Sequence, residues 1–215
     1  MPDRGYVTLM QEGRSLVEDR KSRFIGRAAH VSSEKDAYSY IDDIRRSEKG
    51  AAHNVYAFII GRYSEVSRSS DDGEPSGTSG RPCLEALTRA GLTDSVVVVT
   101  RYFGGTLLGK GGLVRAYGLA AREAVEAAGA ASLVSYMRTR IELEYSDWDK
   151  VSAYLTDEGA KEISPEYAEK ITVSYAIRRN LEDALNKGLT DLLKGKLLIL
   201  ERCEEEKLER IDSHK

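Results

Sequence analysis

Two segments of this sequence concentrate the residue types that could do chemistry. The first is DDGEPSGTSGRP at residues 71–82, where the carboxylates of Asp71, Asp72 and Glu74 could bind a metal, accept protons or pair with arginines. Their spacing fits neither an EF-hand calcium loop nor the G-x-S-x-G turn of a serine nucleophile. We therefore expect no metal and no catalytic residue here. The alternative is a solvated turn whose aspartates hydrogen-bond the backbone.

The second segment is RYFGGTLLGKGGLVRAY at residues 101–117. It begins like a P-loop, but Gly111 stands where a serine or threonine should hold magnesium, so we do not expect nucleoside-triphosphate hydrolysis. Backbone N–H groups at a glycine-rich strand-to-helix junction still suit phosphate or carboxylate. Alternatively, the glycines only permit a tight turn and close helix packing. The predicted anion- or nucleic-acid-binding surface comprises Arg101, Gly104, Gly105, Lys110, Gly111, Gly112 and Arg115.

Further residues could share this surface. His53 directly precedes an apolar strand and is the histidine best placed to transfer protons, although most such rings are only hydrogen-bonded. Tyr102 and Phe103 could stack on bases, and because they alternate at a strand end, we expect one of them to be exposed. Tyr117 falls on an apolar helix face and is expected in the core. The motif residues without an assigned role are His53, Asp71, Asp72, Glu74, Arg81 and Tyr102.

The elements that position these residues follow from turn chemistry and periodicity. Ser33 followed by Asp36 predicts a capped helix, and Pro82 and Gly91 bracket a short second one. The β-branched run DSVVVVTRYF is typical of a central strand. Residues 64–80 hold hardly any apolar side chain, which predicts one long loop. The predicted strands are residues 15–18, 22–31, 54–61 and 94–103, and the predicted helices are 33–44, 81–91 and 113–129.

The chain is predicted to hold two domains of the α+β class. The first covers residues 1–133, and residues 134–206 follow the order β-α-β-β-α-β, which is the ferredoxin-like unit. The charged tail, residues 207–215, is expected to be frayed. The acidic and the glycine-rich segments of the first domain could also pair with each other, in which case both would be structural.

Composition excludes several classes of function. No run approaches the roughly 18 apolar residues of a spanning helix and the start lacks a signal peptide, so we expect a cytoplasmic protein with no membrane partner. Cys83 and Cys203 lie far apart, which predicts neither a disulfide framework nor a zinc site, and no cofactor is expected. The net charge is −3, with +1 before Arg138 and −4 from there on. Any anion-binding patch should therefore be local and lie in the first domain.

Several motifs together resemble a known family. They are KSRFI at residues 21–25, His53-Asn54 before a strand, DDGEPSGTSGRP, and VVVVTRYFGGTLLGKGGLVRAYG. In this order and spacing they are similar to the YigZ/IMPACT family, and the second domain resembles the extra domain of its bacterial members. The resemblance implies the fold of the second domain of ribosomal protein S5 for the first domain, shared with GHMP kinases. It also implies a likeness between the second domain and the last domain of elongation factor G.

The resemblance further implies a link to translation. The eukaryotic relative restrains the amino-acid-starvation kinase by competing for its ribosome-bound activator, but that mechanism does not transfer with the motifs. What transfers by residue is the motif surface, and no catalytic role comes with it. Our leading hypothesis is a non-enzymatic protein that binds RNA, the ribosome or a protein partner of the translation machinery. The alternatives are an enzyme acting on a phosphorylated small molecule or nucleotide, and a protein-interaction module that uses the ferredoxin-like domain.

Overall fold

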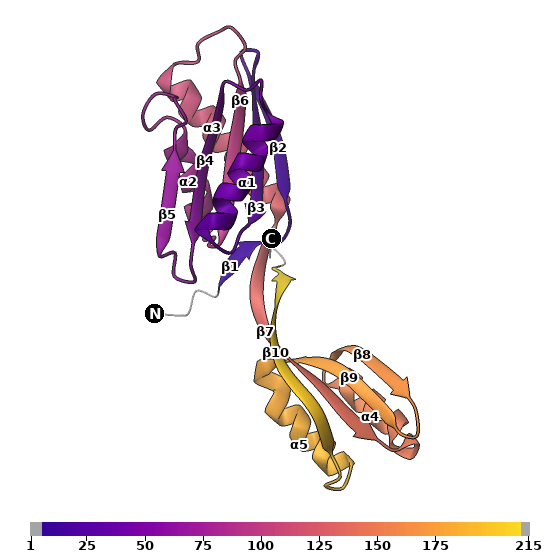
Figure 1. Cartoon of the computed structure of the whole chain (residues 1–215). Helices are drawn as coiled ribbons and strands as arrows, with labels where there is room; N and C mark the ends of the chain where they lie inside the picture. The colour runs from indigo at the N-terminus through magenta and orange to yellow at the C-terminus, as the bar shows by residue number, and fades with distance from the viewer. Residues whose placement is uncertain (1–5, 212–215) are drawn as a thin grey trace. The chain divides into compact units, whose positions relative to one another are not determined.

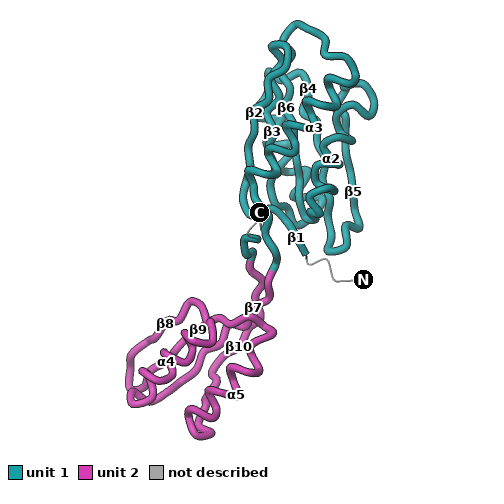
Figure 2. Tube along the Cα trace, turned by 180° about the vertical axis from the view of Figure 1, so that it is seen from behind, with its two compact units in different colours: residues 1–133, 208–215 teal, residues 134–207 magenta. Residues whose placement is uncertain are grey.

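The computed structural model describes residues 6–211. The chain divides into two compact units (Figure 2). Unit 1 contains the residues up to Leu133 together with those from Leu208 on, and unit 2 is Val134–Lys207. Each unit has a hydrophobic core of its own residues, so each is described by itself.

Unit 1 is built on an antiparallel sheet in the order β2-β3-β6-β4-β5. Its central strand carries the valine run, and Val96 to Val99 are all fully buried because helices cover both faces of the sheet. The bounds are β2 Gly13–Asp19, β3 Ser22–His30, β4 His53–Ile60, β5 Val66–Ser70 and β6 Ser95–Tyr102.

Three helices pack on this sheet (Figure 1). Helix α1 (Glu34–Ser47) lies on one face, and the Ser33 side chain caps it by accepting a hydrogen bond from the Asp36 N–H, as the sequence predicts. Helices α2 (Gly80–Arg89) and α3 (Gly109–Ala128) cover the other face and share one core with it. A short strand, β1 (Val7–Leu9), pairs with the first residues of β7 (Ala130–Leu143).

The register of the sheet gathers the motif segments at one end of unit 1. Arg101, near the end of β6, faces Phe24 on β3 and His53 on β4. The turn Arg20–Lys21, residues 48–52, residues 71–79, and residues 103–108 with the first turn of α3 therefore meet there. We call this set of segments the loop end. Tight turns form it, since Arg20 and Lys21 both adopt left-handed backbone angles.

Unit 2 has the predicted β-α-β-β-α-β order, and its strands lie in the order β8-β9-β7 with β10 pairing β7. Helices α4 and α5 share one core with the sheet. This is the ferredoxin-like arrangement, and the α+β class is confirmed. The bounds are β7 Ala130–Leu143, α4 Trp148–Asp157, β8 Lys161–Tyr167, β9 Ile171–Arg178, α5 Glu182–Leu192 and β10 Leu198–Arg210, with 3₁₀ turns Tyr145–Asp147 and Arg179–Leu181 before the two helices.

Two sequence predictions were wrong. Residues 64–80 are not one loop, because β5 forms within them as an edge strand of the sheet. Ser67 and Ser69 lie toward solvent while Val66 packs against the α1 core, and backbone pairing needs no apolar run. The prediction that the tail frays from residue 207 is also wrong for its described part. Strand β10 runs to Arg210, and the N–H of Ile211 donates to the carbonyl of Ala130. Residues 212–215 lie outside the described part.

Candidate functional site

Asp71 organises the acidic loop rather than offering a free carboxylate. Its side chain accepts hydrogen bonds from the backbone N–H groups of Gly77, Ser79 and Gly80 at 2.8, 3.0 and 2.8 Å, and from the Ser79 hydroxyl at 2.7 Å. Partial burial raises the pKa of Asp71, but these hydrogen bonds outweigh burial and hold the pKa below its ordinary value. The carboxylate thus occupies the N-terminus of α2.

Asp72 fastens the same loop to the start of β4. Its Oδ2 accepts from the N–H of Asn54 at 2.6 Å, and its Oδ1 lies 3.1 Å from a guanidinium nitrogen of Arg45. The carbonyl of Asp72 lies 2.7 Å from Nδ1 of His53. Because a carbonyl oxygen only accepts, Nδ1 carries a proton, so Nε2 is the acceptor whenever the ring carries a single proton.

Glu74 turns inward and forms a buried ion pair. Its Oε1 lies 2.6 Å from Nη1 of Arg101 and accepts from the Tyr117 hydroxyl at 2.7 Å, while Nε2 of His53 is 3.9 Å away. Burial and the hydrogen bond to Glu74 raise the pKa of Tyr117, so this hydroxyl remains a donor. Arg101 is only 6% exposed and lies over the rings of Phe24 and Phe103. Its charge is therefore neutralised within the chain.

Different physical constraints explain the individual glycines of the second motif. A Cβ at Gly104 would lie 2.1 Å from the backbone carbon of Lys21, so only glycine fits against that turn. Gly105 and Gly109 have φ angles of 82° and 73°, which favour glycine. At Gly112 a Cβ would press on the Leu108 side chain at 2.9 Å. At Gly111, by contrast, a Cβ would meet no atom within 4 Å.

The basic side chains of this motif also differ in their surroundings. Lys110 is exposed at the start of α3 and forms no ion pair in the described part of the chain. Arg115, one turn further on, lies 3.5 Å from Asp19. No side chain caps α3, and its first turn holds no acidic residue. The acidic and glycine-rich segments thus pair through Glu74, which contacts Arg101 and Tyr117, and not through Lys110 or Arg115.

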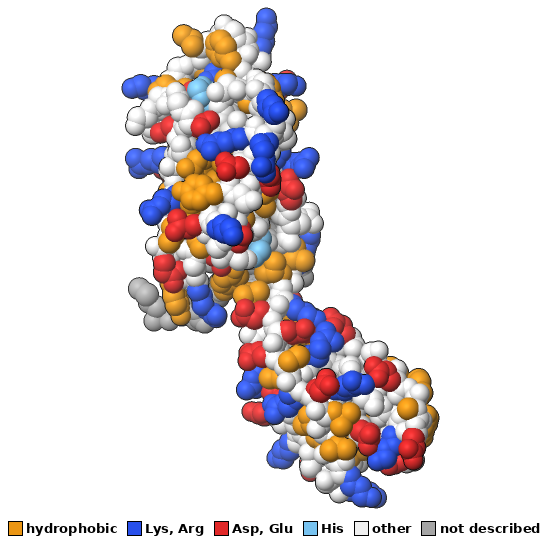
Figure 3. Space-filling view, viewed as in Figure 1, with side chains coloured by type: hydrophobic (Ala, Val, Ile, Leu, Met, Phe, Trp, Pro, Cys, Tyr) orange, Lys and Arg blue, Asp and Glu red, His pale blue; other side chains and the backbone are white. Residues whose placement is uncertain are grey.

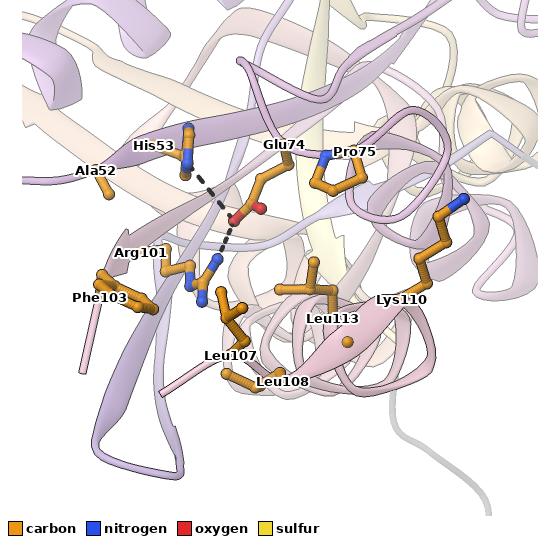
Figure 4. A pocket seen from close by; sticks show the side chains of 11 residues that line it. Ala52, His53, Glu74, Pro75, Arg101, Phe103, Leu107, Leu108, Lys110 and Leu113 are labelled. Atoms are coloured by element: carbon orange, nitrogen blue, oxygen red, sulfur yellow. Dashed lines mark hydrogen bonds and ion pairs between the residues drawn. The ribbon is translucent and has the colours of Figure 1, made fainter. Parts of the chain in front are cut away.

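A pocket of about 550 Å³ lies between the two segments (Figure 4). Side chains of both motifs line it together with apolar ones, and Figure 4 shows the Glu74–Arg101 pair at its inner side with His53 next to it. Its size falls within the roughly 300–1,000 Å³ of small-molecule sites. The lining residues are Ala52, His53, Glu74, Pro75, Arg101, Phe103, Leu107, Leu108, Gly109, Lys110 and Leu113.

The structure brings only some of the expected site residues to this pocket. His53, Glu74, Arg101 and Lys110 line it, whereas Asp71 and Asp72 hold its acidic loop in place. The remaining two residues of the motif surface point elsewhere. Arg81 is exposed on α2 beside Glu85, and the Tyr102 hydroxyl donates to Glu48 under the Arg23 guanidinium.

Sequence reasoning missed the apolar part of the pocket. Leu107 is 79% exposed and Phe103 is 52% exposed, and both line it. The adjacent leucines Leu107 and Leu108 inside a glycine-rich loop are the signal that could have found it, since large apolar side chains at a loop tip often mark a binding surface. Tyr117 is fully buried as predicted, yet its hydroxyl supports Glu74.

At the loop end the acidic side chains have partners, whereas several basic ones do not contact a carboxylate. Its acidic side chains, including Asp19 at the end of β2, all contact an arginine, a hydroxyl or backbone N–H groups: Asp19, Glu48, Asp71, Asp72 and Glu74. Within residues 6–211, its exposed cations Arg20, Lys21, Lys49 and Lys110 have no carboxylate within 4 Å. Elsewhere the two signs are interspersed on the face seen in Figure 3. The loop end thus offers a local excess of free positive charge.

The described residues contain no group of three or more histidine, cysteine, aspartate or glutamate side chains that could hold a metal ion. None of the described helices is long and apolar enough to span a membrane.

The fold and the pocket define the class: a two-domain α+β protein whose glycine-rich loop borders a pocket. The chain belongs to the IMPACT family. Residues 20–125 match the model of the Impact N-terminal domain, and residues 141–196 match a domain of unknown function, DUF1949.

The relatives agree with this assignment. The chain is similar to the IMPACT family member YigZ of Escherichia coli, with 33% identity over 71% of this chain and 76% of the relative. It is also similar to the family member YvyE of Bacillus subtilis, with 45% identity over 55% of this chain, a match that spans about half (54%) of that relative. A crystal structure described as a hypothetical protein aligns with a TM-score of 0.58 and 30% identity, covering 91% of this chain and 96% of that one.

Proposed function

We propose that the protein binds RNA through the loop end of unit 1 and acts on translation by that contact, without catalysis. The observation that carries the proposal is the uneven pairing at this end, where the acids are engaged within the chain and Arg20, Lys21, Lys49 and Lys110 pair with no carboxylate of residues 6–211. Unpaired cations are the groups that release counterions when they contact phosphates. The family resemblance implies a link to translation, and so favours ribosomal RNA.

The structure changes how this proposal should be tested. Reversing the charge of Arg101 would leave Glu74 buried without its partner and would damage the fold, so Arg101 is a poor probe of RNA contact. Lys110 is exposed and has no ion-pair partner among the described residues. Arg122 lies further along the same helix, exposed and beside Glu126, and provides a matched control.

The test measures the affinity of the full chain for a short single-stranded RNA across a salt series, together with co-sedimentation with ribosomes. With four cations engaged, log K should fall against log salt with a slope of about −3. Lys110→Ala should reduce the steepness of that slope by about 0.7, and Arg122→Ala should not change it. Absence of RNA and ribosome binding at low salt would show the proposal to be wrong.

A second candidate function, an enzyme acting on a phosphorylated small molecule, is favoured by one observation. The His53 ring is held by a backbone carbonyl, which leaves Nε2 as an acceptor in a residue that lines the pocket. This is the arrangement that a general base requires. Conversion of any member of a panel of nucleotides and sugar phosphates, lost in His53→Gln while thermal stability is kept, would establish this candidate.

A further inference from the structure

We infer that the pocket of unit 1 accommodates one nucleotide, with its base against the apolar walls and its phosphate at the N-terminus of α3. The inference rests on the proposed RNA binding and adds a defined subsite to it. The expected ligand is a base joined through a sugar to a phosphate. It comes either from an unpaired nucleotide of an RNA or from a free nucleotide. Three features of the pocket carry this inference.

The first feature is the phosphate position. Helix α3 is 20 residues long, has no side-chain cap and has no acid in its first turn, so its first N–H groups and its dipole face outward without an anion. The N-terminus of α2 is different, because Asp71 already occupies it. Lys110 adds an unpaired charge at the rim of the pocket. A phosphate at α3 would find both the backbone donors and the cation.

The second feature is independent of the helix and points to a ligand inside the pocket. Arg101 is 6% exposed, and its side chain is directed into the pocket in Figure 4. One of its nitrogens binds Glu74, but its Nε–H is buried and has no hydrogen-bond partner in the described part of the chain. A buried donor without a partner is costly, so an acceptor at the inner end of the pocket would stabilise the complex.

The third feature is the combination of walls and polar groups. Phe103, Leu107 and Pro75 supply apolar surface, and the exposed Phe103 ring suits stacking on a base. At the inner end, Arg101 offers a donor while Nε2 of His53 offers an acceptor. A base edge carries both donors and acceptors, and a base face is apolar. A sugar phosphate without a base would leave these apolar walls uncovered.

The experiment uses the full chain and two fluorescent probes, a single-stranded oligouridylate with one central 2-aminopurine and free 2-aminopurine riboside monophosphate. Stacking in the pocket should quench the fluorescence of the bound probe. Phe103→Ala should abolish the quenching and weaken binding about tenfold, because the base would lose its aromatic stacking partner. Leu107→Ala, at a more exposed position, is the second variant, and Arg122→Ala is the control. Thermal unfolding checks that each variant is folded.

The outcomes separate this inference from the RNA-binding proposal. Quenching of the RNA probe that is lost in Phe103→Ala supports the subsite with RNA as the source. Quenching of the free nucleotide at comparable concentration supports the subsite with a free nucleotide as the source. RNA binding without quenching, unchanged in Phe103→Ala and Leu107→Ala, overturns the subsite and leaves RNA binding intact. Failure of both probes to bind overturns the subsite, and it overturns the RNA-binding proposal too if the chain also fails to co-sediment with ribosomes.

Discussion

Gly104 and Gly111 belong to one motif, but the surrounding chain constrains only the first. At Gly104 the backbone of the Arg20–Lys21 turn leaves no room for a side chain, whereas the position of a Cβ at Gly111 is empty. Gly111 also lies in α3 and has no positive φ angle. Packing therefore explains one glycine, and the space around the other is open to a ligand.

This difference predicts opposite effects of two single substitutions. Gly104→Ala should lower the free energy of unfolding by about 1–3 kcal/mol, because backbone atoms would have to move. Gly111→Ala should leave it unchanged or raise it by up to about 1 kcal/mol, because alanine favours helix. Chemical denaturation of both variants measures the two changes. Equal losses of stability would contradict this account of the motif.

At the residue scale, the sequence identifies the two motif segments but not the role of each acid within them. Asp71, Asp72 and Glu74 look equivalent as a run of carboxylates, yet one caps α2, one holds β4 and one is buried. These roles depend on contacts with Asn54 and Arg101, which only tertiary structure brings close. For the same reason Arg101 was predicted to belong to the anion-binding surface, whereas in the structure its charge is paired with buried Glu74.

At the scale of elements, strong local signals predicted the structure well. The valine run became the central strand, and the Ser33 cap became the start of α1. Strand β5 could not be predicted because its residues are mostly serine, and it forms only through the backbone edge of β4. Local propensity is a weak guide where a neighbouring strand supplies the pairing.

The start of α2 gives a pH-dependent prediction. The folded-state pKa of Asp71 lies below its ordinary value of about 3.9. Its contribution to the free energy of unfolding is therefore present at neutral pH and is lost as pH falls through the folded-state pKa. Asp71→Asn should cost about 1 kcal/mol at pH 7. The difference between the two proteins should shrink when unfolding is measured toward pH 3. A difference that is constant over this range would show that the charge of Asp71 does not matter.

At the scale of the whole molecule, the two units have separate cores, which predicts separable stability. Glu182 is fully buried at the start of α5 and contacts Arg179 and Arg202, all within unit 2. Glu182→Ala should destabilise unit 2 by about 1–3 kcal/mol, because it removes hydrogen-bonded contacts and leaves a cavity.

Amide hydrogen exchange measures this change unit by unit. Protection should fall in α5 and β9, while β6 and α3 keep theirs. A parallel loss in β6 would contradict the independence of the two cores.

Hydrogen exchange of the full chain with and without single-stranded RNA tests the central claim most directly. If the loop end binds RNA, added RNA should slow exchange in residues 103–113 and 71–79 and around the Arg20–Lys21 turn. Exchange in the strands of unit 2 should not change. Protection confined to β8, β9 and β10, with none at the loop end, would contradict the claim and assign binding to unit 2.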